Sequence, residues 1–242
     1  MRYKRSISPL FNLSIYNGSI AEIKYSSRIR IQYMANPWEE IPLSDYEQHM
    51  SLASVYQLQT MNRAIKKQLD AYPVTSAMIL GIAGGNGLEH VDKAKYRKLY
   101  GVDINRSYLQ EVEKRYADLH GCLQCLCLDL VTDAGRLPRA QLIIADLLIE
   151  YIGYDAFQDT VKAVAPDYVS CMIQINEDEG FVSDSPYLHV FDRLDEVHYR
   201  LSEEGLDKAL LAVGYGRIYR EEYPLPNNKK LLRLDYAVDK QH

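Results

Sequence analysis

The chain has 242 residues, of which 47% are hydrophobic and 25% charged, and its formal net charge is -5. This length and composition are typical of one globular α/β domain with an added segment. No apolar run approaches the ~20 residues that cross a bilayer, so we expect no membrane span, and the net negative charge disfavours bulk binding of nucleic acid.

The first 33 residues differ in charge from the rest of the chain. They hold six basic residues and one acidic residue, together with six serines. Such a basic, serine-rich leader resembles a transit peptide in composition; alternatively, Met34 is the start of translation. We expect 1–33 to be a basic leader outside the functional protein, 34–73 an N-terminal helical lid and 74–242 the ligand-binding domain.

Helices and strands alternate from the lid onward. Apolar residues at helical spacing between Leu52 and Leu69 predict an amphipathic helix, preceded by a loop at 36–42. Next the pattern predicts a strand at Ala77–Leu80, a glycine-rich turn, a helix from about Gly87 to Tyr96, a strand at Leu99–Asp103 and a helix at Arg106–His120.

The second half continues this alternation and then changes. It predicts a strand ending near Asp129, strands at Leu142–Ala145 and Tyr168–Ile175 around a helix at Tyr154–Ala165, a helix from Ser202 to Gly214, and a hairpin of Gly216–Tyr223 and Leu231–Val238. The inner strands are apolar on both faces. They therefore predict a mostly parallel sheet with helices on both sides, which is a three-layer α/β sandwich.

The four cysteines do not form a metal-site pattern. Cys122 and Cys125 have C-x-x-C spacing, but no second pair or histidine pair follows to complete a tetrahedral site. We expect buried, reduced thiols, no metal, and a cytoplasmic location.

A glycine-rich turn follows the first strand of the sheet. Four of the seven residues in 81–87 are glycine, which lets a backbone turn sharply and approach a ligand closely. Asp103 ends the next strand, where a carboxylate can accept hydrogen bonds from a ribose diol. Together they predict a nucleotide-type ligand across the carboxyl ends of two adjacent parallel strands.

This element order and these strand ends resemble class I S-adenosylmethionine-dependent methyltransferases of the small bacterial type, over about residues 75–240. Gly81, Ala83 and Gly85 match the family's G-x-G-x-G turn, while Asp103 and Asp129 match its acidic residues after the second and third strands. The resemblance implies a seven-stranded Rossmann-like sheet with a C-terminal antiparallel hairpin. It also implies transfer of a methyl group from S-adenosyl-L-methionine by in-line displacement.

The resemblance also implies a set of cofactor-binding residues. These are Gly81, Ala83, Gly84, Gly85, Asn86, Asp103, Ile104, Asp129, Leu130, Asp146 and Leu147. Asp103 is expected at the ribose hydroxyls and Asp129 near the adenine, unless Asp129 only caps the following turn. Asp146 is expected beside the methionyl ammonium group, at the substrate mouth, or as a structural cap.

The chain departs from the family pattern at two positions. Ile79 stands where the family often has a carboxylate, and Ala83 replaces the middle glycine. Neither change forbids binding, because the turn contributes mainly backbone N–H groups. A helix beginning near Gly87 would direct its positive end towards the ligand's carboxylate.

The methyl acceptor has no signature in this sequence. Tyr46 and His49 share a helical face in the lid and are the candidate catalytic residues, and Tyr151 and Tyr154 are the candidate substrate residues. The acidic stretch 176–179 could attract a cation or be a solvated loop. No Asn/Asp-Pro-Pro-aromatic motif and no Pro-Cys pair suggests methylation of nucleic-acid bases, so a small-molecule acceptor is expected.

Two other functions compete with this interpretation. An NAD(P)-dependent Rossmann-type oxidoreductase should carry G-x-G-x-x-G; here Gly81 meets the first position, while Ala83 and Asn86 fall at the other two. A non-catalytic S-adenosylmethionine-binding module would keep the same cofactor residues without transferring a methyl group.

Overall fold

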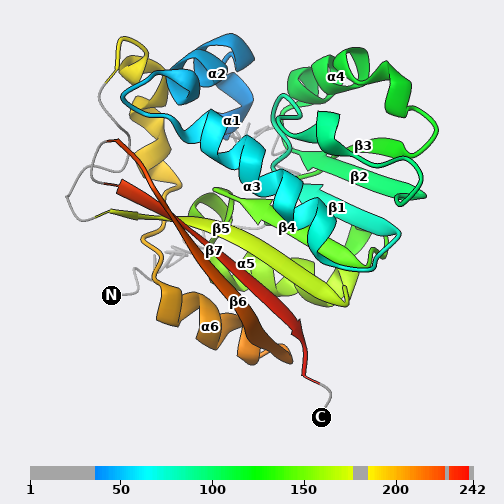
Figure 1. Cartoon of the computed structure of the whole chain (residues 1–242). Coiled ribbons are helices and arrows are strands. Elements are labelled where there is room, and N and C mark those ends of the chain that lie inside the picture. The colour runs from blue at the N-terminus through cyan, green and yellow to red at the C-terminus, as the bar shows by residue number, and fades with distance from the viewer. Residues whose placement is uncertain (1–35, 177–184, 227–228, 240–242) are drawn as a thin grey trace, which may run out of the picture. The chain divides into compact units, whose positions relative to one another are not determined.

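A seven-stranded sheet, in the order β3-β2-β1-β4-β5-β7-β6, organises the computed structural model, which describes residues 36–176, 185–226 and 229–239 (Figure 1). The strands are β1 (Ser76–Leu80), β2 (Lys98–Asp103), β3 (Leu123–Cys127), β4 (Leu142–Asp146), β5 (Tyr168–Asn176), β6 (Tyr215–Pro224) and β7 (Lys229–Val238). β1 to β5 pair in parallel, and β7 is antiparallel to both β5 and β6. The expected sheet with a C-terminal hairpin is confirmed.

Six α-helices surround this sheet within the described residues. They are α1 (Pro37–Glu40), α2 (Leu43–Ser51), α3 (Gln57–Ala71), α4 (Arg106–Arg115), α5 (Ile149–Val164) and α6 (Glu203–Leu211). Short 3-10 helices are η1 (Leu88–His90), η2 (Ala117–Leu119), η3 (Ala134–Arg136) and η4 (Leu188–Glu196).

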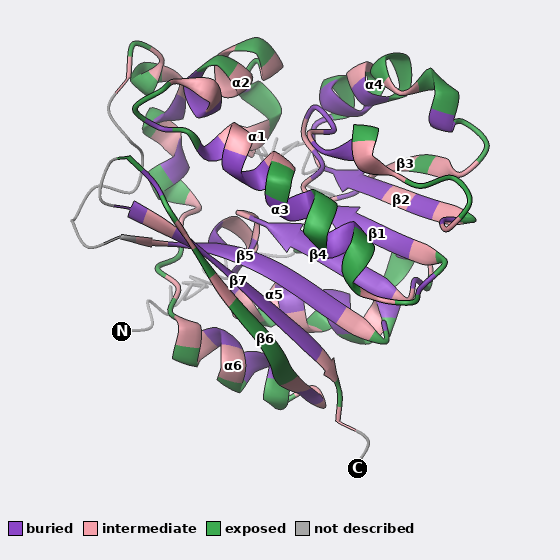
Figure 2. Cartoon of the chain, viewed as in Figure 1, coloured by how far each residue is buried: buried purple, intermediate pink, exposed green. Residues whose placement is uncertain are grey.

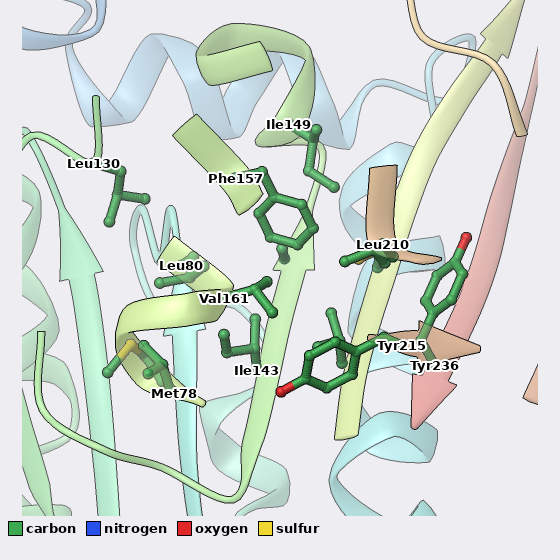
Figure 3. Close-up of a cluster of buried hydrophobic side chains, with 14 of the residues drawn as sticks. Met78, Leu80, Leu130, Ile143, Ile149, Phe157, Val161, Leu210, Tyr215 and Tyr236 are labelled. Atoms are coloured by element: carbon green, nitrogen blue, oxygen red, sulfur yellow. The ribbon is translucent and has the colours of Figure 1, made fainter. Parts of the chain in front are cut away.

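The helices bury both faces of the sheet. α3 and α4 pack on one face, where Ile65, Leu69, Leu109 and Val112 meet the strands. α5 and α6 pack on the other face. Figure 3 shows Phe157, Val161 and Leu210 of these helices against Met78, Leu80 and Ile143 of the strands. The inner strands are accordingly buried, whereas much of the edge strand β6 is exposed (Figure 2).

The α-helix expected from Gly87 to Tyr96 does not form. The chain makes only the 3-10 turn Leu88–His90 and then irregular turns. A Cβ atom at Gly87, whose φ is +92°, would lie 2.7 Å from Ile65 of α3, and the Tyr96 hydroxyl donates to the Leu69 carbonyl at 2.6 Å. α3 therefore covers this part of the sheet, and no α-helix begins directly after the glycine-rich turn.

Two other helices differ from expectation at their ends. The amphipathic helix expected between Leu52 and Leu69 begins only at Gln57, as α3, and residues 52–56 separate it from α2, with Tyr56 in a left-handed conformation (φ 55°). α5 begins at Ile149, ahead of the expected Tyr154, and contains a kink at Gly153 (φ 74°). Each break is next to a residue that lines a cavity: Tyr56 precedes Gln57, and Gly153 follows Ile152.

Some expectations concern parts of the chain that the structure does not describe. The basic leader 1–33 and the acidic residues 177–179 lie outside the described residues. Residues 35–242 form one compact unit. In the described part of this unit, no helix has the length and apolar character needed to cross a membrane.

Candidate functional site

The glycine-rich turn joins the carboxyl ends of β1 and β2. Gly81 and Gly85 have φ values of +65° and +82°, and Ala83 is left-handed as well, with φ +46°. The Gly81 N–H donates to the Val102 carbonyl at 2.8 Å. A left-handed conformation is unfavourable for a residue with a Cβ atom. Ala83 nevertheless adopts it, so the turn has at this position the backbone conformation that glycine adopts most easily.

Asp103, at the end of β2, holds this turn in place. Its Oδ2 accepts from the Ala83 N–H at 2.9 Å, and its Oδ1 accepts from the Asn105 N–H at 2.8 Å. Burial raises the pKa of Asp103 to about 6, although these backbone donors lower it. Each carboxylate oxygen retains a lone pair that could accept a further hydrogen bond.

Asp146 ends β4 and is also buried. Its Oδ1 accepts from the Gln68 amide at 2.8 Å, but its Oδ2 has no hydrogen-bond partner among the described residues. Burial raises the pKa of Asp146 to about 7. A buried carboxylate oxygen without a donor is costly, so its presence beside a cavity indicates a place for a donor or a cation.

A first cavity lies along the ends of β2, β3 and β4. It encloses about 700 Å³ of unfilled space, including its open mouth. Asp103, Ile104, Asp129, Leu130 and Asp146 line it. Asp129 is half-buried, and its Oδ1 accepts from the Val131 N–H at 2.9 Å, so it caps the turn after β3 while facing the cavity.

A second cavity lies beneath the glycine-rich turn and holds about 430 Å³ of unfilled space, including its open mouth. Its wall includes Gly84, Asn86 and Glu47. The Glu47 carboxylate of α2 pairs with the Arg115 guanidinium of α4, whose Nη2 lies 3.0 Å from Oε2. A Cβ atom on Gly84 would lie 2.2 Å from Glu47 Oε1. Glycine at this position therefore allows α2 to close over the turn.

A third cavity lies between α2, β5 and η4 and holds about 480 Å³ of unfilled space, including its open mouth. His49, Gln57 and Gln174 contribute polar side chains to it, and Trp38, Tyr151 and Phe191 contribute aromatic ones. The Gln57 amide donates to the Gln174 side-chain oxygen. The remaining wall is Tyr46, Met50, Leu147 and Leu194.

Tyr46 of α2 lines all three cavities. Burial raises the pKa of its hydroxyl well above the ordinary value, and nearby Asp103 and Glu47 raise it further. The hydroxyl therefore stays protonated at neutral pH. The first and third cavities also share the lining residues Trp38, Leu147 and Tyr151, so these two cavities are adjacent.

The structure brings most of the expected site residues together. Of the expected cofactor residues, all except Gly85 line the first or second cavity, and Tyr46, His49 and Tyr151 line the third. Gly85 instead faces the Tyr116 ring, where a Cβ atom would approach to 2.7 Å. The Tyr154 hydroxyl lies at the start of α6, where it accepts from the Ser202 N–H at 3.0 Å and is not brought to these cavities.

The sequence did not single out several residues of the site. Tyr108 anchors the N-terminal segment by donating to the Ile41 carbonyl at 2.8 Å, and Asn105 does so by donating to the Trp38 carbonyl at 2.9 Å. Gln68 of α3 and Gln174 of β5 are polar residues in otherwise buried positions. A glutamine that interrupts an apolar strand pattern is a sequence signal for Gln174, whereas Gln68 stands among polar residues of a helix and has no such signal.

No protein-family model matches the chain, and no curated protein matches its sequence. Solved structures match it by shape. The magnesium protoporphyrin IX methyltransferase ChlM from Synechocystis PCC 6803, with bound S-adenosylhomocysteine, has a TM-score of 0.58 at 11% identity, over 81% of this chain and 93% of that chain. The N-methyltransferase NodS from Bradyrhizobium japonicum WM9, in complex with S-adenosylhomocysteine, has a TM-score of 0.56 at 11% identity, over 82% and 98%.

A third structure with this fold is described as a cyclase. SpnF has a TM-score of 0.57 at 10% identity, over 74% of this chain and 80% of that chain. At such low identities the likeness concerns the fold. The chain has the fold of the class I S-adenosylmethionine-dependent methyltransferases, as its sequence motifs predict.

Proposed function

We propose that this protein is an S-adenosylmethionine-dependent methyltransferase that acts on a small-molecule acceptor. The observation that carries the proposal is the meeting of three cavities at Tyr46. The sulfonium centre of S-adenosylmethionine bears three groups: an adenosyl group, an aminocarboxypropyl group and the methyl group. A site for it needs three compartments around one point, and the described residues supply them.

The first cavity suits the adenosyl group. Asp103 would accept hydrogen bonds from the ribose hydroxyls, because each of its oxygens already has one backbone donor and room for a second. Ile104 and Leu130 would pack on the base, and Asp129 would face its exocyclic amine. This assignment follows the order of the strand ends around the cavity.

The second cavity suits the aminocarboxypropyl group. The unpartnered Oδ2 of Asp146 would accept from the ammonium group, and this contact would compensate its burial. Backbone N–H groups of the turn around Gly84 and Asn86 would serve the carboxylate. Because no α-helix begins directly after the turn, the backbone N–H groups of the turn would have to bind this carboxylate without a helix dipole.

When bound, S-adenosylmethionine supplies a methyl group on a positively charged sulfur, ready for in-line displacement. The protein's part is alignment and exclusion of water. Tyr46 and Trp38, which lie edge to face with ring centroids 5.9 Å apart, would place aromatic rings beside the cationic sulfur. We infer that residues 36–73 act as the lid, because α2 closes all three cavities.

Calorimetric titration with S-adenosylmethionine, S-adenosylhomocysteine and NADH tests this proposal. We expect both sulfur ligands to bind at one site per chain and NADH to give no binding heat. Binding of NADH alone would favour the oxidoreductase and overturn the proposal.

The second candidate is a role without methyl transfer. It is supported by the fold likeness to SpnF, which is a cyclase. Release of S-adenosylhomocysteine from S-adenosylmethionine in the presence of a metabolite panel separates the two. Turnover above the acceptor-free rate supports the methyltransferase, whereas tight binding without turnover across a broad panel supports the second candidate.

A further inference from the structure

The walls of the third cavity are apolar and aromatic. Trp38 and Tyr151 meet edge to face with ring centroids 4.8 Å apart, and the Phe191 ring lies 4.7 Å from the His49 ring. These aromatic side chains border about 480 Å³ of unfilled space, including its open mouth, and such a lining suits an apolar ring compound, because contact with it removes apolar surface from water.

His49 is the cavity's one histidine, and its position is fixed. It is 4% exposed, and its Nδ1 lies 2.7 Å from the Ser185 hydroxyl, which also accepts from the Tyr187 N–H at 3.1 Å. When Nδ1 donates to Ser185, Nε2 carries a lone pair and can take a proton. The ring therefore has the geometry of a held general base.

Burial, together with a nearby positive charge, favours the neutral form of His49. Burial lowers the pKa of the imidazole below its ordinary value, and the nearby Lys229 ammonium lowers it further. The two tyrosines of the cavity, Tyr46 and Tyr151, have raised pKa values because they are buried, so their hydroxyls stay protonated. At neutral pH the imidazole can therefore accept a proton.

The lining of the third cavity disfavours charged acceptors. Among the described residues that line it, there is no carboxylate and no ammonium or guanidinium group. A charged acceptor would lose its hydration without gaining an opposite charge from these lining residues. The Trp38 indole N–H, buried and without a hydrogen-bond partner among the described residues, calls for an atom with a lone pair, which an alkylammonium group lacks.

We propose that the acceptor is an uncharged ring compound that bears a hydroxyl group, such as a phenol, and that His49 removes the hydroxyl proton during transfer. This inference rests on the proposed function. The acceptor oxygen bonds to the methyl carbon as the carbon–sulfur bond breaks, and that bond's electron pair stays on sulfur. The hydroxyl proton moves to His49 Nε2 and then to solvent, so the products are a methyl ether and a neutral thioether.

Binding of three matched probes tests the acceptor class without turnover. The protein is saturated with S-adenosylhomocysteine and titrated with 4-methylphenol, 4-methylbenzoate and 4-methylbenzylamine, and binding is followed by calorimetry and by the fluorescence of Trp38, the chain's single tryptophan. We expect the phenol to bind at least tenfold more tightly than either charged probe. Tighter binding of the carboxylate or of the amine would overturn the proposal.

His49→Asn tests the base. Asparagine keeps a polar atom near Nδ1 for Ser185 and removes Nε2, so phenol binding should change less than threefold while the methylation rate falls about 100-fold or more. The wild-type rate should rise with pH and level off once the imidazole is neutral, and the variant should lose this rise. An unchanged rate and pH profile would refute the role of His49, and thermal unfolding of both proteins checks that the variant folds.

These outcomes separate the inference from the proposed function. If the wild-type protein fails to bind S-adenosylhomocysteine, the proposed function fails first. If it binds S-adenosylhomocysteine and methylates another class of acceptor in preference to phenols, only the acceptor inference fails.

Discussion

At the scale of single residues, Asp146 shows how a ligand site can oppose stability. Its buried carboxylate has one donor, Gln68, and one unpartnered oxygen. Gln68 also donates to the Ser170 hydroxyl at 3.0 Å, and Ser170 donates to Asp235, which pairs with buried Arg233. This network fixes Oδ1 of Asp146, and the Arg233 charge lowers the pKa of Asp146, but no group among the described residues donates to Oδ2.

Asp146→Asn should therefore stabilise the ligand-free protein and weaken ligand binding. The amide removes a buried charge, and we expect about 1–3 kcal/mol of added stability at pH 8, together with a loss of S-adenosylmethionine affinity of tenfold or more. Chemical denaturation and calorimetry measure the two effects. Asp159→Asn, on the exposed side of α5, is the matched control and should change neither.

The pH dependence of the ligand-free protein follows from the same carboxylate. The pKa of Asp146 is about 7 in the folded protein against an ordinary value of 3.8, so the folded state binds a proton more tightly than the unfolded state. The free energy of unfolding should fall as pH rises from about 4 to about 7. Denaturation curves of the wild-type protein and of Asp146→Asn check this, because the variant should lose that part of the pH dependence.

Cofactor affinity should change with pH in the opposite direction. In the proposed site the ammonium group would bind the charged form of Asp146, so we expect the association constant to rise with pH until about 7 and then level off. Asp103, with a pKa of about 6, should add a second rise at lower pH. Affinity that is flat from pH 5 to pH 8 would contradict both assignments.

At the scale of elements, an ion pair joins α4 to α2, in the segment that we propose as the lid, beside Gly84 of the glycine-rich turn. Glu47 and Arg115 are partly exposed, so the pair's own contribution is modest, about 0.5–1 kcal/mol. Glu47→Gln and Arg115→Gln should each speed release of S-adenosylhomocysteine about twofold to fivefold, and the double variant should add little. Stopped-flow dissociation measures this, and Glu204→Gln, which breaks the exposed pair on α6, is the control.

Gly84→Ala should reproduce the effect of the lid variants. Its φ is not in the left-handed region, so the substitution does not strain the backbone, but the new methyl group would displace the Glu47 carboxylate. We expect faster ligand release with nearly unchanged thermal stability. A large loss of stability would show instead that the turn itself had been disrupted.

The sequence predicted the sheet better than it predicted the helices around it. Long apolar runs such as Leu142–Ala145 can bury only as inner strands, and the strand ends bring Asp103 and Asp146 to one edge. The helix expected after Gly87 does not form, because Ile65 of α3 occupies the space beside Gly87, and this long-range contact is not visible in the local sequence. Cavity walls built from α2, β5 and η4 likewise depend on tertiary packing, which periodicity does not report.

At the scale of the whole molecule, ligand binding should raise the stability of the folded chain. A ligand at 100 times its Kd adds about 2.7 kcal/mol, which for a domain of this size is about 5–10 °C in Tm. Thermal unfolding with S-adenosylhomocysteine should show this rise, and an equal concentration of NADH should leave Tm unchanged. Equal shifts from both ligands would contradict a selective site.

α2 carries Tyr46, Glu47 and His49 on a single nine-residue helix, and these residues line the cavities assigned to the cofactor and to the acceptor. In the proposed site, a movement of α2 that released one ligand would also open the cavity of the other, so we expect exchange of the two ligands to be coupled. Steady-state turnover should follow a compulsory order in which the cofactor binds first and its thioether product leaves last. S-adenosylhomocysteine should then inhibit competitively against S-adenosylmethionine and non-competitively against the acceptor.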